Sequence, residues 1–308
     1  MRHPARALAV LFLCAACTDT SRESTGASKD IQRREEAKAE ERGRRYGVKP
    51  VPPWGLDLQT EYSRLRILEL GHRRTLLFVR DDGQVTIHSE VNLASPHTLS
   101  VPYMRTMFAS YLFHERPERV LIVGLGGGSM VRFLEHYDPS VIVDAIDLDP
   151  QMLEIADEYF GTRPSENIHL IAADGFEFIR RTQHEYDVIF MDAFLNPDFE
   201  SDDSGAPLRM KEAPFYDVVL EKLTPEGVVS FNLTPHSGLS EEIKGIRRAF
   251  PQTYLFQPPR DHNLIAIATR GYAVDTAELV RRGKSLDARF ESELSFTELS
   301  RQLREGGV

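Results

Sequence analysis

The stretch VLIVGLGGGSMVRFLEHYDPSVIVDAIDLD, residues 120–149, decides the fold. Its first four residues form a short, continuous apolar run, which is typical of a strand that is buried on both faces. The glycine-rich turn at 124–128 follows, and residues 129–137 have the composition of a helix. A second apolar run at 141–146 ends at Asp147. This order of strand, glycine turn, helix and strand predicts one unit of an open, mostly parallel sheet.

The same alternation continues toward the C-terminus. A helix is predicted at 150–160, and further buried strands are predicted at 168–172, 186–191, 227–232, 253–256 and 264–268. Together with the first two runs, these strands predict a seven-stranded α/β sheet that binds its ligand at the carboxyl ends of the strands. Upstream, apolar-rich runs at 65–70, 75–79 and 84–88 predict a small β-rich domain, and residues 103–114 a helix.

The composition excludes several classes of protein. The chain has 308 residues, with 37 basic and 47 acidic side chains, which give a formal net charge of −10. A protein that binds nucleic acid through phosphate contacts is usually basic, so we expect no nucleic-acid partner. The only two cysteines are Cys14 and Cys17. The rest of the chain therefore has neither a disulfide framework nor cysteine ligands for zinc, and we expect no metal.

The N-terminus has the layout of a secretory signal. Arg2 and Arg6 precede an apolar run at 7–16, whose last two alanines lead directly to Cys17. The run is too short to span a bilayer as a helix. Small residues before a cysteine resemble a bacterial lipoprotein signal, which implies lipidation at Cys17, membrane anchoring and a position facing the periplasm. The alternatives are an ordinary signal peptide, or a cytoplasmic protein whose start is assigned too early.

These observations divide the chain into five parts. The mixed charges after the signal are typical of a solvated helix or a flexible tether. We expect Trp54, near the end of this linker, to pack against the small domain. The parts are a signal or lipoprotein segment at 1–17, a charged linker at 18–55, a small β-rich domain with a helix at 56–115, a Rossmann-like sheet domain at 116–274 and a helical tail at 275–308.

Glycines and acidic residues stand where the predicted strands end. Glycines let the backbone approach a ligand closely, and a carboxylate at the second strand end is well positioned to bind ribose hydroxyls. The alternative is that Asp149 and Asp174 only cap the helices that follow them. The residues are Gly124, Gly126 and Gly128 after the first strand, Asp147 after the second, Asp174 and Gly175 after the third, and Asp192 after the fourth.

The glycine turn also limits the class of ligand. No lysine follows the glycines, which excludes a P-loop, and their spacing differs from the usual dinucleotide fingerprint. Acidic strand ends favour a cationic, adenosine-bearing ligand over a polyphosphate. A sulfonium such as S-adenosylmethionine therefore fits best.

The sequence resembles spermidine synthase and its relatives. The likeness lies within residues 60–270, in four blocks that occur in family order: VLIVGLGGGSMVRFLEHY, VDAIDLDPQMLEIADEYF, DGFEFI and YDVIFMDAF. The closer likeness is to a spermidine-synthase-like branch with a Y-x-R-x-M pattern, here Tyr103, Arg105 and Met107. The resemblance implies a methyltransferase-like Rossmann sheet after a small β-rich domain, and aminopropyl transfer in polyamine biosynthesis.

The resemblance also implies roles for single residues. The co-substrate would be decarboxylated S-adenosylmethionine, or S-adenosylmethionine itself, and the partner a small-molecule amine. Members of the family commonly form homodimers through the N-terminal β domain. The residues and their implied roles are Gly124, Gly126 and Gly128 under the adenosyl ligand, Asp147 at its ribose, Asp174 and Gly175 at its adenine, Asp192 as the catalytic residue, and Gln84 and Tyr103 in the substrate pocket.

Two positions depart from the family pattern. Gly127 stands where spermidine synthases have an aspartate for the aminopropyl ammonium, and Leu195 where they have one for the diamine. A cation that is buried without a partner costs on the order of several kcal/mol. The departures favour an alternative, an S-adenosylmethionine-dependent methyltransferase, and a non-catalytic protein that binds an adenosyl ligand is another. Acidic residues of the following loop could replace the missing pair: Asp198, Glu200, Asp202 and Asp203.

Overall fold

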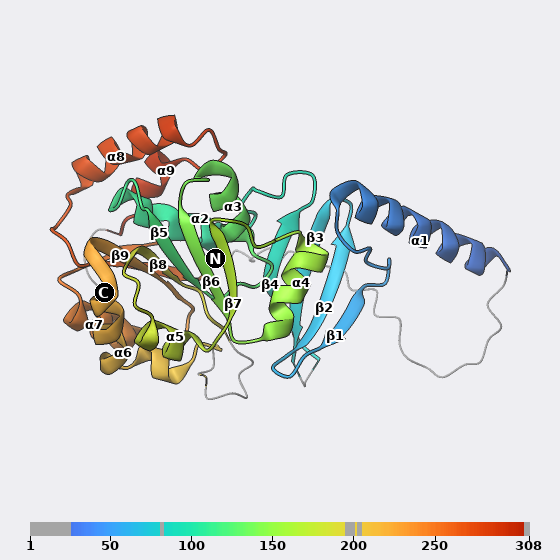
Figure 1. Cartoon of the computed structure of the whole chain (residues 1–308), viewed down its shortest axis with the longest axis horizontal. Helices are drawn as coiled ribbons and strands as arrows, with labels where there is room; N and C mark the ends of the chain where they lie inside the picture. The colour runs from blue at the N-terminus through green and yellow to red at the C-terminus, as the bar shows by residue number, and fades with distance from the viewer. Residues whose placement is uncertain (1–25, 81–82, 195–200, 202–204, 305–308) are drawn as a thin grey trace, which may run out of the picture.

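The computed structural model describes residues 26–80, 83–194, 201 and 205–304. Figure 1 shows a large sheet with helices on both faces, standing beside a smaller sheet. The large sheet has seven strands in the order β10-β11-β9-β8-β5-β6-β7, and the small one four strands in the order β1-β2-β3-β4. The predicted fold, a seven-stranded Rossmann-like sheet after a small β-rich part, is confirmed.

The large sheet is parallel except at one strand. Its central strands pair in parallel, whereas β11 is antiparallel to both of its neighbours. The central strands β5 and β8 are short and apolar, which suits a position buried on both faces. The strands are β5 (Arg119–Val123), β6 (Ile142–Asp147), β7 (Ile168–Ala172), β8 (Tyr186–Met191), β9 (Leu223–Leu233), β10 (Gln252–Phe256) and β11 (Leu264–Thr269).

Helices cover both faces of this sheet because successive strand side chains point to opposite faces. In β5, Val120 and Ile122 belong to one core cluster with α3, α8 and α9, while Leu121 and Val123 belong to another with α5, α6 and α7. The helices are α2 (Pro102–Met107), α3 (Ser129–Tyr137), α4 (Pro150–Phe160), α5 (Gly175–Arg181), α6 (Ala213–Glu221), α7 (Leu239–Ala249), α8 (Thr276–Arg289) and α9 (Phe296–Ser300), with short 3₁₀ turns η1 (Phe108–Leu112) and η2 (Leu208–Lys211).

The small sheet is antiparallel and packs against the large domain through α4. Its buried face contributes Leu65 and Ile67 to a core cluster that also contains Met152 and Ile155 of α4. This contact holds the two sheets together, so that a space between them can have walls from both. The strands are β1 (Leu56–Gln59), β2 (Arg64–Leu70), β3 (Arg73–Val79) and β4 (Val85–Asn92).

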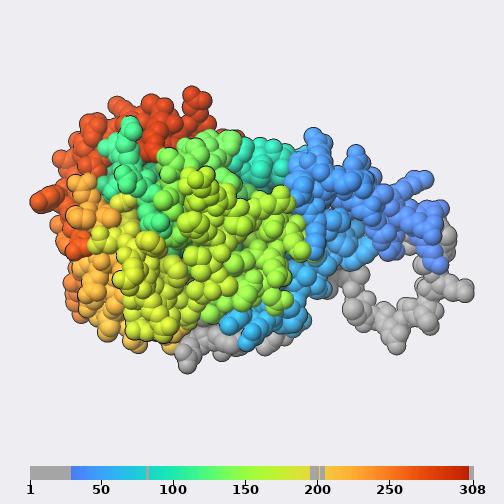
Figure 2. All heavy atoms as spheres, in the orientation of Figure 1, coloured from blue at the N-terminus to red at the C-terminus, as the bar shows by residue number. Residues whose placement is uncertain are grey.

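The segment before the small sheet differs in part from the predicted linker. Helix α1 (Gly26–Tyr46) extends away from the body of the molecule (Figures 1 and 2). Val51, in the segment after it, is fully buried in the core between α4 and the small sheet. Trp54 is 58% exposed, so the expectation that it packs against the small domain was wrong. Within the described ranges, no helix is long and apolar enough to cross a membrane.

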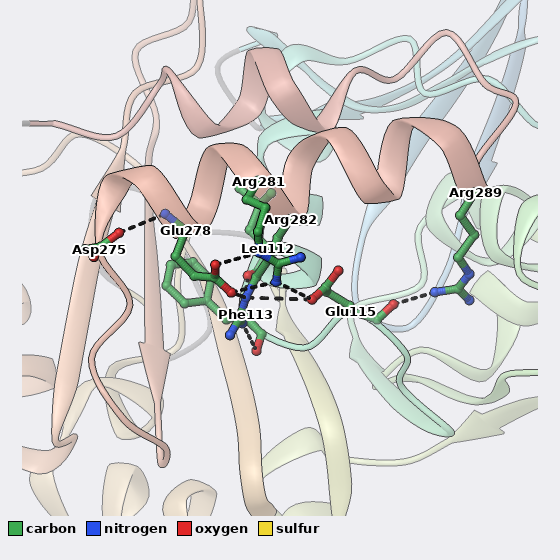
Figure 3. A network of polar contacts seen from close by, with 8 residues as sticks. All are labelled: Leu112, Phe113, Glu115, Asp275, Glu278, Arg281, Arg282 and Arg289. Atoms are coloured by element: carbon green, nitrogen blue, oxygen red, sulfur yellow. Dashed lines mark hydrogen bonds and ion pairs between the residues drawn. The ribbon is translucent and has the colours of Figure 1, made fainter.

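The C-terminal helices are tied to the segment that leads into β5 (Figure 3). Arg282 of α8 donates to the carbonyl oxygens of Leu112 and Phe113, both at 3.1 Å. Arg289 donates to the Glu115 carbonyl and forms an ion pair with buried Asp138. This tail therefore closes one face of the domain and supports α2 and η1.

Candidate active site

The register of the central strands brings three predicted site residues to one edge of the sheet. The last residue of β5 lies opposite Ile146 of β6 and Met191 of β8. The next residues along each strand, Gly124, Asp147 and Asp192, therefore reach the same carboxyl edge, where open α/β sheets bind their ligands. The Gly124 amide donates to the Ile146 carbonyl at 2.9 Å, which holds this edge together.

The first residue of the turn has to be glycine. Gly124 has a φ of +99°, and a Cβ atom there would lie 2.3 Å from the carbonyl oxygen of Asp192. Asp147 holds the rest of the turn, because its Oδ2 accepts from the amides of Leu125 at 3.0 Å and Gly126 at 3.4 Å. The glycine turn and the end of the second strand thus form one unit.

Acidic groups beside this unit leave acceptor atoms for a ligand. Burial raises the pKa of Asp147 to about 6, against the effect of the backbone amides that donate to it. Asp149 caps α4 by accepting from the Gln151 amide at 3.0 Å. Its other oxygen is buried and has no hydrogen-bond partner among the described residues. A buried acceptor without a partner is costly, so a donor such as a ribose hydroxyl fits here.

Asp174, which follows β7, caps the next helix and forms an ion pair. Asp174 accepts from the Glu177 amide at 3.1 Å through Oδ1, so it caps α5, and Gly175 is the buried first residue of that helix. The Oδ2 atom of Asp174 forms an ion pair with Arg209, whose guanidinium also lies over the ring of Phe176. In the predicted contact, an adenine amino group would share the Asp174 carboxylate with these two donors.

Asp192 is the central group of the site. It is 8% exposed, and its Oδ1 accepts from the Asn232 amide nitrogen at 2.8 Å. The Tyr103 hydroxyl donates to Oδ2 at 3.3 Å, which is long for a hydroxyl donor. Burial raises the pKa of Asp192 to about 7, although both hydrogen bonds act in the opposite direction. A carboxyl group with this pKa can accept and release a proton near neutral pH.

Two hollows meet at Asp192. The larger has a volume of about 420 Å³, which is within the range of small-molecule sites. The smaller, of about 60 Å³, is lined by Asp147, Asp149, Asp174 and Gly175, and Arg209 also lies against it. The residues shared by both hollows are Ser63, Phe78, His88, Gly124, Asp192 and Phe194. The site is therefore one branched space between the small sheet and the edge of the large sheet.

Of the two predicted substrate residues, the structure brings only Tyr103 to this space. Tyr103 lines the larger hollow, and its hydroxyl pKa is raised well above the usual value by burial and then by the charge of Asp192. Gln84 is exposed in the turn between β3 and β4 and does not line the hollow. The structure therefore gives no support to a place for Gln84 in the substrate pocket, and that assignment stays a prediction.

Three polar residues of the site were missed from the sequence. Asn232 lies in β9, and Asp261 and Asn263 lie in the loop before β11. Asn263 donates to the side-chain oxygen of Asn232 at 2.8 Å, and Asn232 in turn holds Asp192. Asn232 stands near the end of a predicted strand, which was a usable signal. Asp261 and Asn263 had no such signal in the sequence, since only the fold brings them near Asp192.

The departure at Gly127 has a physical cause. A Cβ atom at this position would lie 2.8 Å from the Ser89 hydroxyl and 3.0 Å from the ring of Phe160, so an aspartate would require these two side chains to shift. Gly128, the last glycine of the turn, has a φ of +76° and is the N-cap residue of α3. Cys17, Leu195, Asp198, Glu200, Asp202 and Asp203 lie outside the described residues.

The acidic groups suit a sulfonium-bearing adenosyl ligand, and the Gly124 turn allows close backbone approach. Asp147, Asp149 and Asp174 line the smaller hollow, and Asp192 lies where the two hollows meet. Across the described ranges, no group of three or more His, Cys, Asp or Glu side chains is arranged to hold a metal ion.

The fold is that of methyltransferase-like α/β proteins, and the candidate site lies at the carboxyl edge of its large sheet. The family model of the spermine/spermidine synthase domain matches residues 103–250. Over these residues the chain is similar to the spermidine synthase family.

Relatives with two kinds of chemistry are similar to this chain. The polyamine aminopropyltransferase of Vibrio vulnificus is 29% identical over 204 residues, which cover 65% of this chain and 66% of that protein. The eEF1A lysine and N-terminal methyltransferase of Bos taurus is 36% identical over 158 residues, 47% of this chain and 22% of that protein. This chain thus spans less than two thirds of either relative.

A solved structure is similar over the large domain. Human methyltransferase-like protein 13, crystallised with SAH, has a TM-score of 0.57 and is 28% identical, covering 62% of this chain and 93% of that one.

Proposed function

We propose that this chain transfers an aminopropyl group from decarboxylated S-adenosylmethionine to an amine. The observation that carries the proposal is the state of Asp192, a buried carboxyl group with a pKa of about 7 at the junction of the two hollows. The similarity to polyamine aminopropyltransferases supports the donor and the reaction type. The acidic strand ends, with Asp147 beside the glycine turn, support an adenosyl sulfonium as the donor.

The reaction is a displacement at carbon. The acceptor enters as an ammonium, which has no lone pair, so the Asp192 carboxylate first takes one of its protons. The nitrogen lone pair then attacks the aminopropyl carbon bonded to sulfur. The carbon–sulfur bond breaks, its electron pair stays on sulfur, and neutral methylthioadenosine leaves. The hydrogen bond from Asn232 fixes the orientation of Asp192, which helps to hold the three reacting atoms in line.

Methyl transfer from S-adenosylmethionine is the second candidate. It is favoured by Gly127, which supplies no carboxylate to bind an aminopropyl ammonium and is packed closely against Ser89 and Phe160. The 36% identity to a lysine methyltransferase also supports it. The acceptor would again be an amine, and Asp192 would again take its proton.

Product analysis separates the two reactions. The purified protein is incubated with each donor and an amine mixture, and the released nucleoside is identified by mass spectrometry. We expect methylthioadenosine from decarboxylated S-adenosylmethionine and no turnover of S-adenosylmethionine. Release of S-adenosylhomocysteine would instead establish methyl transfer. If neither donor reacts but both bind, the proposal of catalysis is refuted and the chain is a binding protein.

For the location of the protein we propose a lipoprotein anchored at Cys17 and facing the periplasm. The support is the sequence alone, namely the basic residues, the apolar run and the small residues before Cys17. After expression of the full chain in bacteria with labelled palmitate, we expect label in the wild type and none in Cys17→Ser. An unlabelled, cytosolic wild type would contradict the proposal.

The homodimer likewise stays a prediction.

A further inference from the structure

The two carboxylate oxygens of Asp192 have different surroundings. Oδ1 accepts from the Asn232 side chain at 2.8 Å, whereas Oδ2 lies 3.3 Å from the hydroxyl of Tyr103, a residue that lines the larger hollow. A carboxylate can take a proton on either oxygen, so its neighbours decide which one reacts. The inference that follows rests on the proposed function, since it concerns the base of that reaction.

The register of three neighbouring strands brings a further residue into line with Asp192. Strands β8 and β9 pair in parallel up to the residues just before Asp192 and Asn232, so these two side chains lie next to each other on one face. Strands β9 and β11 are antiparallel, with Asn232 opposite Ile265. Asn263, two residues before Ile265, is therefore a diagonal neighbour of Asn232 on the same face.

The chemistry of these groups sets the direction of their hydrogen bonds. An ionised carboxylate only accepts, so Asn232 must turn its NH₂ group toward Asp192. The side-chain oxygen of Asn232 then points away from Asp192 and needs a donor, because Asn232 is only 7% exposed. Asn263 supplies that donor, at 2.8 Å. The two amides thus form a chain of hydrogen-bond donors that ends at the ionised carboxylate.

The loop before β11 holds Asn263 by its backbone. The Asn263 amide donates to Oδ1 of Asp261 at 3.1 Å, and its carbonyl accepts from the Gln257 side chain at 3.0 Å. Gln257 also donates to the Asp261 carbonyl, at 3.2 Å. Arg260, in the same loop, has a φ of +59°, which is uncommon for a residue other than glycine. Such strain persists where the surroundings fix the backbone, so this loop keeps Asn263 in one place.

The chain of amides acts differently on the two states of Asp192. Each hydrogen bond in such a chain polarises the next one, which strengthens the bond to the ionised carboxylate. If Asn232 turned its oxygen toward Asp192 instead, Oδ1 would have to carry a proton. With Asn263 in place, Oδ1 is occupied by a donor, and a proton from the acceptor is taken at Oδ2.

The other titratable groups around Asp192 differ from this pair, because they act through charge. The charges of Asp192 and Asp261, together with burial, raise the pKa of Tyr103 well above its usual value, so Tyr103 is a neutral donor. Burial lowers the pKa of His88 to about 4, so it is neutral at pH 7. The amides can therefore be altered without removing a charge. The other charged residues that line the two hollows are Arg64, Arg80, Glu90, Asp147, Asp149, Asp174, Arg209 and Asp261.

We propose that Asn263 is a positioning residue for the base. Through Asn232 it keeps Oδ1 of Asp192 occupied and leaves Oδ2 to take the proton of the acceptor ammonium. Its effect on the reaction passes through the orientation of Asn232 and the ionisation of Asp192.

Replacement of Asn263 tests the proposal through the titration of Asp192. Asn263→Leu keeps the size of the side chain but removes the hydrogen bond to Asn232, so the ionised carboxylate loses support. We expect the midpoint of kcat/KM against pH to move upward by about one unit, the equivalent of one hydrogen bond. The rate lost at pH 7 should return above the new midpoint, which would not happen in a misfolded variant. Binding of the adenosyl donor should not change.

A second variant reverses the chain and keeps the shape of the side chain. In Asn263→Asp the new carboxylate accepts from Asn232, which must then turn its oxygen toward Asp192. The reversal and the added charge both favour a protonated Asp192, so the midpoint should rise further than in Asn263→Leu. Asn92→Asp is the matched control, because Asn92 lies outside both hollows and its side-chain oxygen accepts from the Ala94 amide, as an aspartate can. It should leave the midpoint unchanged.

A measurement without turnover separates this inference from the proposed function. Full-length protein with ¹³C in its aspartate carboxyl groups is titrated by NMR, and the Asp192 signal is identified by its loss in Asp192→Asn. We expect Asp192 to titrate about one unit higher in Asn263→Leu than in wild type. An unchanged or lower midpoint would overturn the proposal, whether or not the transfer reaction is observed. If Asn263→Leu does not fold, Asn263→Asp is compared with Asn92→Asp by the same criterion.

Discussion

Asp192→Asn should lower kcat by about 10²- to 10⁴-fold, the usual range for the loss of a general base. Asparagine has nearly the same shape and keeps a carbonyl oxygen that can accept from Asn232, but it cannot take a proton from the acceptor ammonium. We expect the dissociation constant of the donor to change little, since the adenosine contacts lie at Asp147 and Asp149. Rates of methylthioadenosine release and calorimetric titration of the donor check both parts.

The pH dependence gives this prediction a second readout. Because the carboxylate form is the active one, wild-type kcat/KM should rise with pH through about pH 7. The folded-state pKa is raised above the ordinary 3.8, so the group favours folding at low pH, and that contribution is lost as pH rises through 7. In Asp192→Asn both effects should be absent, and the variant should gain thermal stability relative to wild type above pH 7.

A surface variant provides the control for Asp192. Asp217→Asn makes the same chemical change on the exposed face of α6. It should leave the rate and its pH profile unchanged. Turnover of Asp192→Asn at a tenth of the wild-type rate or more would show that another group takes the proton.

Gly124→Ala should destabilise the fold by about 3 kcal/mol or more and abolish measurable donor binding. The backbone at Gly124 has a φ of +99°, which costs a residue with a Cβ atom about 1–3 kcal/mol. The added methyl group would also lie 2.3 Å from the Asp192 carbonyl oxygen, so the ends of β5 and β8 must separate. Urea unfolding and donor titration measure the two losses.

Gly71→Ala separates backbone strain from collision. Gly71 has a φ of +63° in the turn between β2 and β3, and a Cβ atom there would meet nothing within 4 Å. This variant should lose only about 1–2 kcal/mol and keep donor binding intact. Equal losses in the two variants would mean that strain alone explains Gly124 and that close approach to Asp192 is unimportant.

Much of the large sheet could be predicted because its strands are short, apolar and buried on both faces. The predicted strands at 168–172 and 186–191 coincide with β7 and β8, and the predicted helix at 129–137 coincides with α3. Strand β1 was missed, since its four residues alternate polar and apolar side chains and lie at a sheet edge. The predicted helix at 103–114 divides into α2 and the 3₁₀ turn η1.

The sequence by itself determined the edge at which the ligand binds, because strand, glycine turn and strand-end aspartate are local features. Gly124, Asp147 and Asp192 follow from that pattern alone. Only the tertiary structure decided the state of Asp192, since burial raises its pKa and Asn232 orients it. The wall that the small sheet forms around the hollow was also decided only by the tertiary structure. Arg80 lies more than a hundred residues from Asp192, and only the packing of the small sheet against α4 holds them around one space.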